Sequence, residues 1–235
     1  PSGSGNQNTK DATFLGPRHG SVNISDGKAP ANLDKPNGIS MDQEMQRHAL
    51  RQAANEKFLS RRRTAMTEAY TQTYDQAKLL MEKKNLFDIT AEPGPLADKY
   101  GRHDFGRHCL LARRLLEGGA TFVKVTHTNY DTHHENFDFH IEQLGEFDRP
   151  FASLIEDLDM RGMLDSTLVV VMSEFGRTPN INRNYGRDHW SKAWSVALAG
   201  CGIQKGAVVG KTNANGTAVV DREVNGGHLF HTYLK

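Results

Sequence analysis

The stretch ATFVKVTHTNYDTHHENF, residues 120–137, joins two different patterns at one point of the chain. Its first eight residues, 120–127, are dense in β-branched side chains and short enough for a buried strand. Acidic and imidazole side chains follow at once, over residues 131–135. We therefore expect a strand that runs directly into a polar loop.

The segments on either side of this stretch predict helices. HDFGRHCLLARRLLEGGA, residues 103–120, spaces its apolar residues for a helix and closes with Gly118 and Gly119, which is typical of a glycine C-cap. Beyond the loop, apolar residues from Phe137 to Leu158 recur at spacings of three and four, with a bend expected at Pro150.

Two later segments complete the predicted fold. TLVVVMS, residues 167–173, is a clear strand pattern, and WSVALAGCGI, residues 194–203, is a candidate for another strand. A strand, a helix and a strand with a crossover of this length imply a parallel pair in a βαβ unit. The pattern predicts an α/β fold around a mostly parallel sheet.

Composition limits the class of protein. The chain of 235 residues is 37% hydrophobic and 24% charged, enough for one globular domain with a sizeable core. The net charge of +1 gives no electrostatic reason to expect nucleic acid or an anionic membrane as a partner. No window approaches the roughly 18 to 20 uninterrupted apolar residues of a spanning helix, and no apolar signal core is present. Two cysteines are too few for a disulfide framework, and Cys109 is expected to be a buried free thiol.

The chain divides into three segments by composition. Residues 1–40 are rich in Gly, Asn, Pro, Ser and Lys, and we expect an irregular segment that drapes over a surface. Residues 41–95 are predicted to be helical, with one or two amphipathic helices over 41–83, where no Gly or Pro occurs; the basic run SRRRT, residues 60–64, is interpreted as a solvated helix face. Residues 96–235 are expected to form the α/β core.

Acid and imidazole groups gather at the ends of the predicted strands, where open parallel sheets bind ligands. These residues come from the loops VTHTNYDTHHE, SEFGRTP and YGRDHW, and are Asp131, His133, His134, Glu174, Asp188 and His189. Carboxylate and imidazole together suit a divalent transition metal. Alternation along an extended segment points Asp131 and His133 to the same side and His134 away.

Each of the three groups has a structural alternative. The adjacent histidines could be surface residues, Glu174 could pair with Arg177, and Asp188 could hold His189 against Trp190. All three groups together could form only a hydrogen-bonded loop network without a metal. Other chemistries are poorly supported, because the chain has no GxGxxG opening a helix after a strand, no GxxxxGK[ST], no GxSxG and no CxxC.

Several motifs resemble a known family. YGRHDFGRHCLLARRLLEGGATFVKV, YDTHHENF, VVVMSEFGRTPNIN, GRDHWSKAWSVALAGCGIQKGAVVGKT and HLFHTYLK are together similar to the DUF1501 family of sulfatase-like proteins, placed in the alkaline phosphatase and sulfatase superfamily. The resemblance covers nearly the whole chain and is most specific over residues 100–235. It implies a three-layer α/β/α sandwich around a mostly parallel sheet. Because family members extend further at the N-terminus, the chain is expected to be a C-terminal portion of that fold.

The resemblance also implies roles for single residues. Asp131, His133, Glu174 and His189 match superfamily metal ligands, Asp188 stands beside a ligand, and Arg177 is expected to contact an anionic substrate oxygen; Arg177 and Asp188 are thus the catalytic candidates. Two features depart from the superfamily: Glu174-Phe175 stands where Asp-His or Asp-Asn is usual, and no nucleophile is identified in the chain.

These roles imply a metal-dependent hydrolase of sulfate or phosphate esters. The expected cofactor is a divalent metal, zinc first, with calcium, manganese or magnesium as alternatives, and the expected substrate is an anionic ester, including one on a sulfated or phosphorylated glycan. The alternative is a catalytically inactive relative that binds anionic polysaccharide or acts as an envelope scaffold. Family resemblance suggests an exported, periplasmic or cell-envelope location, and it leaves the oligomeric state open.

Overall fold

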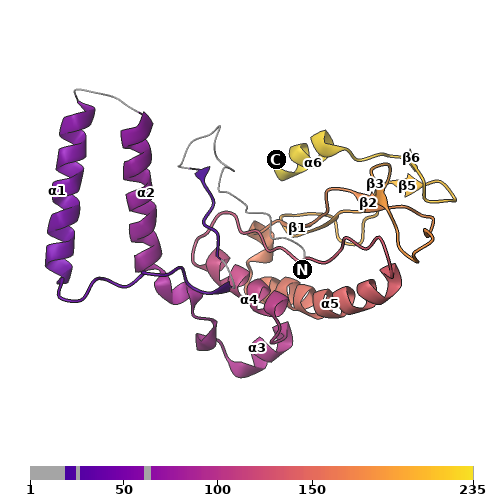
Figure 1. Ribbon diagram of the computed structural model, residues 1–235, viewed down its shortest axis with the longest axis horizontal. Coiled ribbons are helices and arrows are strands. Elements are labelled where there is room, and N and C mark those ends of the chain that lie inside the picture. Colours follow the sequence, from indigo (N-terminus) through magenta and orange to yellow (C-terminus); the bar gives the residue numbers. More distant parts are fainter. Residues whose placement is uncertain (1–18, 25–26, 61–64, 235) are drawn as a thin grey trace. The chain divides into compact units, whose positions relative to one another are not determined.

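The computed structural model describes residues 19–24, 27–60 and 65–234. The chain forms two compact units, Pro1–Ala91 and Glu92–Lys235, and each is described by itself. Figure 1 shows the elements of both.

The first unit is built on a pair of helices, α1 (Met41–Leu59) and α2 (Ala65–Glu82), followed by the short 3-10 helices η3 (Lys84–Phe87) and η4 (Ile89–Ala91). A capping box starts α1: the Ser40 hydroxyl accepts from the Gln43 amide, and the Gln43 side chain accepts from the Ser40 amide. The prediction of one or two helices over 41–83 is therefore confirmed. Residues 1–18, 25–26 and 61–64 lie outside the described residues. They include part of the irregular segment predicted over 1–40 and most of the SRRRT run.

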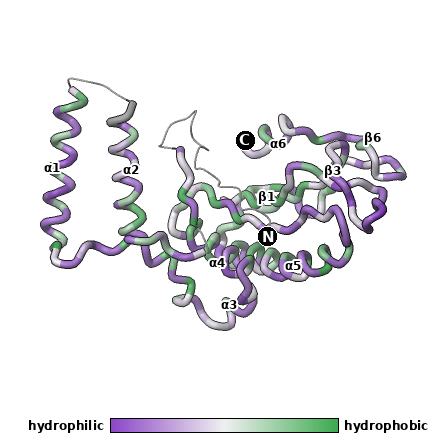
Figure 2. Tube along the Cα trace, in the orientation of Figure 1, coloured by the Kyte–Doolittle hydropathy of each residue, from purple (hydrophilic) through white to green (hydrophobic). Residues whose placement is uncertain are grey.

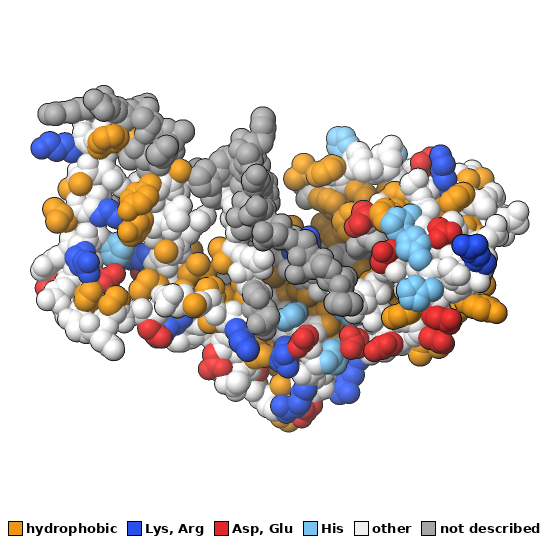
Figure 3. Space-filling view, in the orientation of Figure 1, with side chains coloured by type: hydrophobic (Ala, Val, Ile, Leu, Met, Phe, Trp, Pro, Cys, Tyr) orange, Lys and Arg blue, Asp and Glu red, His pale blue; other side chains and the backbone are white. Residues whose placement is uncertain are grey.

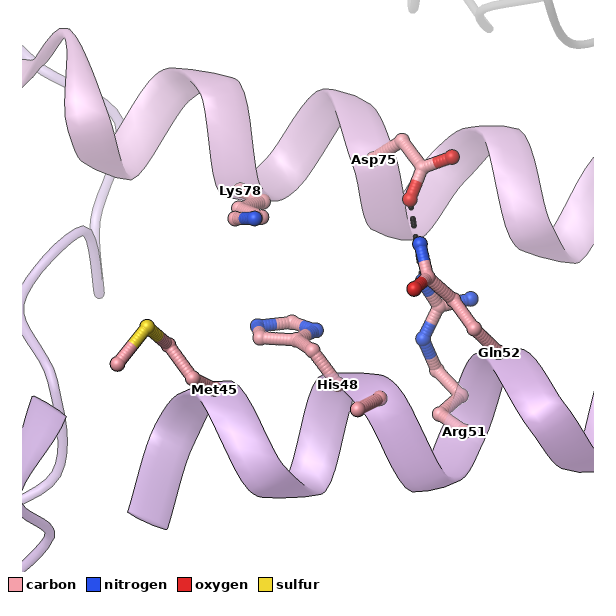
Figure 4. Close-up of a pocket in the computed structure, with 7 residues that line it drawn as sticks. Met45, His48, Arg51, Gln52, Asp75 and Lys78 are labelled. Carbon is pink, nitrogen blue, oxygen red and sulfur yellow. Dashed lines mark hydrogen bonds and ion pairs between the residues drawn. The ribbon is translucent and has the colours of Figure 1, made fainter. Parts of the chain in front are cut away.

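Side-chain hydrogen bonds link α1 and α2. Arg51 donates to Asp75 at 3.0 Å, and Asn55 donates to Thr71 at 2.9 Å. Figure 2 accordingly draws most of α1 in the hydrophilic colour. Figure 4 shows a shallow hollow between these helices, lined in part by Met45, His48 and Lys78; none of the candidate ligands belongs to it.

The core of the second unit lies among three helices, α3 (Gly94–Tyr100), α4 (Asp104–Glu117) and α5 (Asn136–Met160). Helices α4 and α5 pack side by side and bury mainly aliphatic and aromatic side chains, including Phe105, Cys109, Leu110, Leu111, Leu154 and Leu158. Cys109 is buried and free, as predicted, and burial raises the pKa of its thiol to about 12. The unit also contains η5 (Leu164–Ser166) and α6 (Gly226–Tyr233).

The end of α4 confirms the predicted glycine cap. The amide of Gly119 donates to the Leu116 carbonyl, and the amide of Ala120 donates to the Leu115 carbonyl, each at 2.9 Å. This pair of bonds is a Schellman motif, and it needs a left-handed residue, which Gly119 supplies with φ of 95°. The cap turns the chain back along α5 toward the polar loop.

A buried charge network also joins the helices. The Arg113 guanidinium is 1% exposed and lies 2.7 Å from Glu92 and 3.0 Å from Asp157. Asp157 in turn accepts from the Tyr100 hydroxyl at 2.9 Å. A buried charge of this kind is tolerated only because carboxylates surround it.

The strands of the described residues form three antiparallel pairs. Strand β1 (Val169–Val171) pairs with β4 (Ala197–Ala199), β2 (Gly176–Arg177) with β3 (His189–Trp190), and β5 (Lys211–Thr212) with β6 (Val219–Asp221). The predicted strands over 167–173 and 194–203 are thus present as β1 and β4. The described residues form both helices and strands, which agrees with the predicted α/β class only at this coarse level.

Two predictions are wrong: the strand over 120–127 and its parallel pairing with the strand over 167–173. Residues 121–127 belong to no strand in the described structure, and β1 pairs only with β4 there, in antiparallel register. Local β propensity favours an extended backbone, but a strand also needs a partner, which lies elsewhere in the sequence and leaves no local signal. The described strands show neither a parallel sheet nor a three-layer sandwich.

Candidate metal centre

Two separate parts of the second unit supply the predicted ligands. Asp131 and His133 lie in the loop between α4 and α5, and His189 begins β3. The register of β2 and β3 sets Arg177 opposite His189. Figure 3 shows histidine side chains gathered beside acidic ones on this part of the surface.

Three donor atoms converge. Asp131 Oδ1 lies 3.0 Å from His189 Nε2 and 3.1 Å from His133 Nε2, and the two Nε2 atoms are 3.1 Å apart. We name these three atoms the donor triangle. Ligands of one tetrahedral zinc ion with bonds of about 2.0–2.1 Å are separated by about 3.3 Å, so the triangle is close to the spacing that such an ion needs.

The protonation of His133 gives the triangle its chemical meaning. His133 Nδ1 lies 2.8 Å from Asp188 Oδ1. An ionised carboxylate can only accept, so Nδ1 carries the hydrogen, which leaves Nε2 as the ring nitrogen that a metal can bind. His133 Nε2 faces the Asp131 carboxylate and the second imidazole. His189 Nε2 either carries a hydrogen and donates to Asp131 Oδ1 or, without that hydrogen, offers a second nitrogen lone pair to a cation.

A turn at Asn182 holds the two parts of the site together. Its side-chain amide donates to the His133 carbonyl at 3.0 Å and to Asp188 Oδ1 at 3.2 Å. Its side-chain oxygen accepts from the amides of Asn184 and Gly186, at 2.9 and 3.0 Å. Sequence reasoning missed Asn182; the only local signal was the turn-forming run NRNYG that it begins.

Gly186 allows this turn to touch the ligand loop. A Cβ atom at this position would lie 2.0 Å from the His133 carbonyl oxygen, a separation that no side chain can adopt. The backbone of the turn therefore contacts the His133–His134 peptide directly, and any larger residue would push the two loops apart.

Arg177 ties the same segments from the other side. Its guanidinium donates to Asp131 Oδ1 at 2.8 Å, to the Tyr130 carbonyl at 2.7 Å and to the Arg187 carbonyl at 3.0 Å. Its predicted partner Glu174 is not among these contacts. Arg177 positions Asp131, and its N–H groups are largely used within the protein.

These contacts shift the acidity of both aspartates. The hydrogen bond from Arg177, followed by that from His189, lowers the pKa of Asp131 to about 2. The hydrogen bonds from His133 and then Asn182 lower the pKa of Asp188. Both side chains are therefore anionic near neutral pH, as metal coordination and ring orientation require.

The triangle faces solvent. The side chains of Asp131, His133 and His189 are 73%, 42% and 51% exposed. One wall is apolar, because the Phe175 ring packs on His189 with ring centres 4.3 Å apart. A ligand can approach the donor atoms without displacing any part of the core.

The remaining predicted residues are distributed as follows. Asp188 adjoins the triangle and orients His133 instead of holding His189. Glu174 is exposed in the bend before Phe175 and does not belong to the cluster of candidate ligands among the described residues, so its role as a ligand stays a prediction. His134 lies outside the triangle, as predicted, and packs edge-on against Phe139.

Comparisons with known proteins place the chain in context. A family model described as "Protein of unknown function (DUF1501)" matches residues 1–235. No curated protein and no solved structure matches the chain. None of the helices in the described part of the chain has the length and apolar character that crossing a membrane requires.

Proposed function

The chain belongs to the DUF1501 family, and from this premise and the geometry of its loops we propose that it is a metal-dependent hydrolase of sulfate or phosphate esters. The donor triangle carries the proposal. It combines one carboxylate with two imidazoles, the ligand set of three-ligand catalytic zinc sites that keep a further position open.

The surrounding residues have separate tasks. Asp188 holds the Nδ1–H of His133, so Nε2 points its lone pair into the triangle. Arg177 keeps Asp131 ionised and in place. A divalent ion bound by these groups would supply the positive charge that neutralises ester oxygens as the bond to the leaving group breaks.

Other features belong to the proposal by family resemblance. Glu174 is a candidate further ligand, since it precedes the Phe175 ring that packs on His189. Zinc is the first metal to test, and calcium, manganese and magnesium follow. A three-layer α/β/α sandwich, a sulfated or phosphorylated glycan as substrate, and export to the periplasm or cell envelope complete the proposal.

Metal binding is tested by titration of the protein with Zn²⁺ and Mn²⁺ in a calorimeter. We expect one ion per chain, and loss of at least 100-fold in affinity in Asp131→Asn, His133→Ala and His189→Ala. His134→Ala is the matched control, because this neighbouring histidine lies outside the triangle. Equal metal affinity in all four variants would show that the triangle does not bind the metal and is only part of a hydrogen-bonded loop network.

Catalysis is tested separately with aryl sulfate and aryl phosphate. Turnover that requires the metal and disappears in His133→Ala supports the hydrolase. Metal binding without turnover, together with retention of a sulfated polysaccharide, would instead support the inactive, glycan-binding alternative.

A further inference from the structure

The two imidazoles of the donor triangle are oriented in different ways. Nδ1 of His133 donates to the Asp188 carboxylate at 2.8 Å. Nδ1 of His189 forms no hydrogen bond with any residue that the structure describes, and only Nε2 of this ring does. Metal-binding histidines almost always donate their second ring N–H to a carboxylate, a backbone carbonyl or water, which fixes the orientation of the ring. No described protein group does this for His189, so its ring needs another means of orientation.

An aromatic ring takes the place of that protein partner. The Phe175 ring packs on the His189 ring, with 4.3 Å between ring centres and 37° between ring planes. The His133 ring lies 4.8 Å from the same imidazole. Rotation of the His189 side chain would break the contact with Phe175, so this contact keeps Nε2 directed at Asp131 and His133.

The register of β2 and β3 explains why these two rings meet. Arg177 lies opposite His189, and Phe175 comes two residues before Arg177. Side chains two residues apart on an extended segment share a face, and diagonal neighbours in an antiparallel pair are within reach of an aromatic side chain. Phe175, Arg177 and His189 therefore project from the same face of the β2–β3 pair as the donor triangle.

Phe175 is the firmly held member of the ring pair. A Cβ atom at Gly176 would lie 2.5 Å from the Ala193 carbonyl oxygen, so the backbone beside Phe175 packs directly on the next segment. The Phe175 carbonyl also accepts from the Ser173 hydroxyl at 2.9 Å. Phe175 is half-buried, whereas the His189 side chain is 51% exposed. The ring of Phe175 is thus a support against which the exposed imidazole rests.

We propose that Phe175 is a positioning residue of the metal centre, which holds His189 by ring contact where Asp188 holds His133 by charge. This inference rests on the proposed function, because it requires that the donor triangle binds the metal. A carboxylate on Nδ1 also raises the basicity of a histidine ligand. An aromatic ring gives His189 orientation without that added charge. Phe175 therefore contributes to metal affinity only through His189.

The test measures the zinc dissociation constant by competition with a chromogenic chelator. Phe175→Leu removes the ring and keeps an apolar side chain, and we expect zinc affinity to fall about tenfold, at the lower end of the usual cost of losing an orienting partner. Phe175→Tyr keeps the ring and should restore an affinity close to that of the wild type. Phe139→Leu is the matched control, because the Phe139 ring packs on His134, which lies outside the triangle.

A double-mutant cycle separates positioning from a general effect on the fold. In the His189→Ala background, Phe175→Leu should cause no further loss of zinc affinity, since the residue through which it acts is already gone. Circular dichroism verifies that each variant is folded. An equal loss in both backgrounds would assign Phe175 a structural role and overturn the proposal.

Two further outcomes tell this inference apart from the proposed function. If Asp131→Asn and His189→Ala lose zinc affinity while Phe175→Leu binds as the wild type does, the metal centre stands and the role of Phe175 is overturned. If the wild-type protein binds no zinc at the donor triangle, the proposed function and the role of Phe175 fail together.

Discussion

At the scale of single residues, Asp188 acts on the proposed centre through its hydrogen bond to His133. Asp188→Asn keeps the shape of the side chain but removes the charge that fixes the Nδ1–H tautomer. We expect zinc affinity to fall by roughly 10- to 100-fold, the usual cost of losing such an orienting partner. Calorimetric titration measures it, with Asp165→Asn, an exposed aspartate in η5, as the control. Unchanged affinity in Asp188→Asn would show that His133 does not depend on this contact.

The hydrogen bond between Arg177 and Asp131 can be removed by a single substitution. Because the Arg177 hydrogen bond is the main cause of the low pKa of Asp131, Arg177→Gln should raise that pKa from about 2 toward its ordinary value near 3.9. Carboxyl carbon chemical shifts, followed by NMR from pH 1.5 to 6, report the midpoint in the metal-free protein. Arg183→Gln, an exposed arginine of the neighbouring turn, should not move it. A midpoint that stays near 2 without Arg177 would assign the shift to another group.

At the scale of elements, the site depends on how closely the Asn182–Gly186 turn approaches the ligand loop. Gly186→Ala would drive a methyl group into the His133 backbone, so we expect a loss of a few kcal/mol in unfolding free energy and weaker zinc binding. Gly145→Ala makes the same chemical change on an exposed turn of α5 with open space around it. That variant should gain up to about 1 kcal/mol through helix propensity. Urea denaturation measures both, and equal effects of the two substitutions would contradict the close packing.

The sequence predicts the elements of the second unit better than their pairing. Gly118 and Gly119 mark the end of α4 because a cap is a local feature of backbone conformation. Likewise, the β-branched run over 167–173 marks β1. The partner of β1, however, lies 30 positions away, from Val169 to Ala199, so the antiparallel register of β1 with β4 could not be seen from either segment alone.

The same distinction applies to the site. Asp131, His133 and His189 were identifiable because their residue types suit a metal and because they flank predicted strands. Asn182 and the orienting role of Asp188 were not, since both depend on hydrogen bonds across 49 and 55 positions of the chain. Glu174 follows a predicted strand just as convincingly, yet the bend before Phe175 keeps it out of the cluster.

At the scale of the whole molecule, the buried charge network makes the second unit sensitive to acid. Burial alone would raise the pKa of Glu92, but hydrogen bonds from Arg113 and Arg114 outweigh burial and lower it. A carboxyl whose pKa is lower in the folded state stabilises the fold above its ordinary pKa, and that contribution is lost as pH falls through the folded value. Stability of this unit should therefore decline below about pH 4.5.

Glu92→Gln tests this account. It removes the charge that compensates Arg113, so we expect a loss of about 3 kcal/mol at pH 7 and a shallower decline between pH 5 and 3. Urea denaturation followed by tryptophan fluorescence reports on this unit, because both tryptophans, Trp190 and Trp194, belong to it. Glu142→Gln, exposed on α5, is the control. Parallel pH profiles in the wild type and Glu92→Gln would show that another group dominates.

The donor triangle is the claim on which the proposed function depends, and anomalous diffraction at the zinc edge from zinc-loaded crystals tests it most directly. We expect one strong anomalous peak within about 2.2 Å of Asp131 Oδ1, His133 Nε2 and His189 Nε2. A zinc peak elsewhere on the protein would contradict this claim. So would the absence of a peak between His133 Nε2 and Asp131 Oδ1, with these two atoms in the same contact as in the metal-free state.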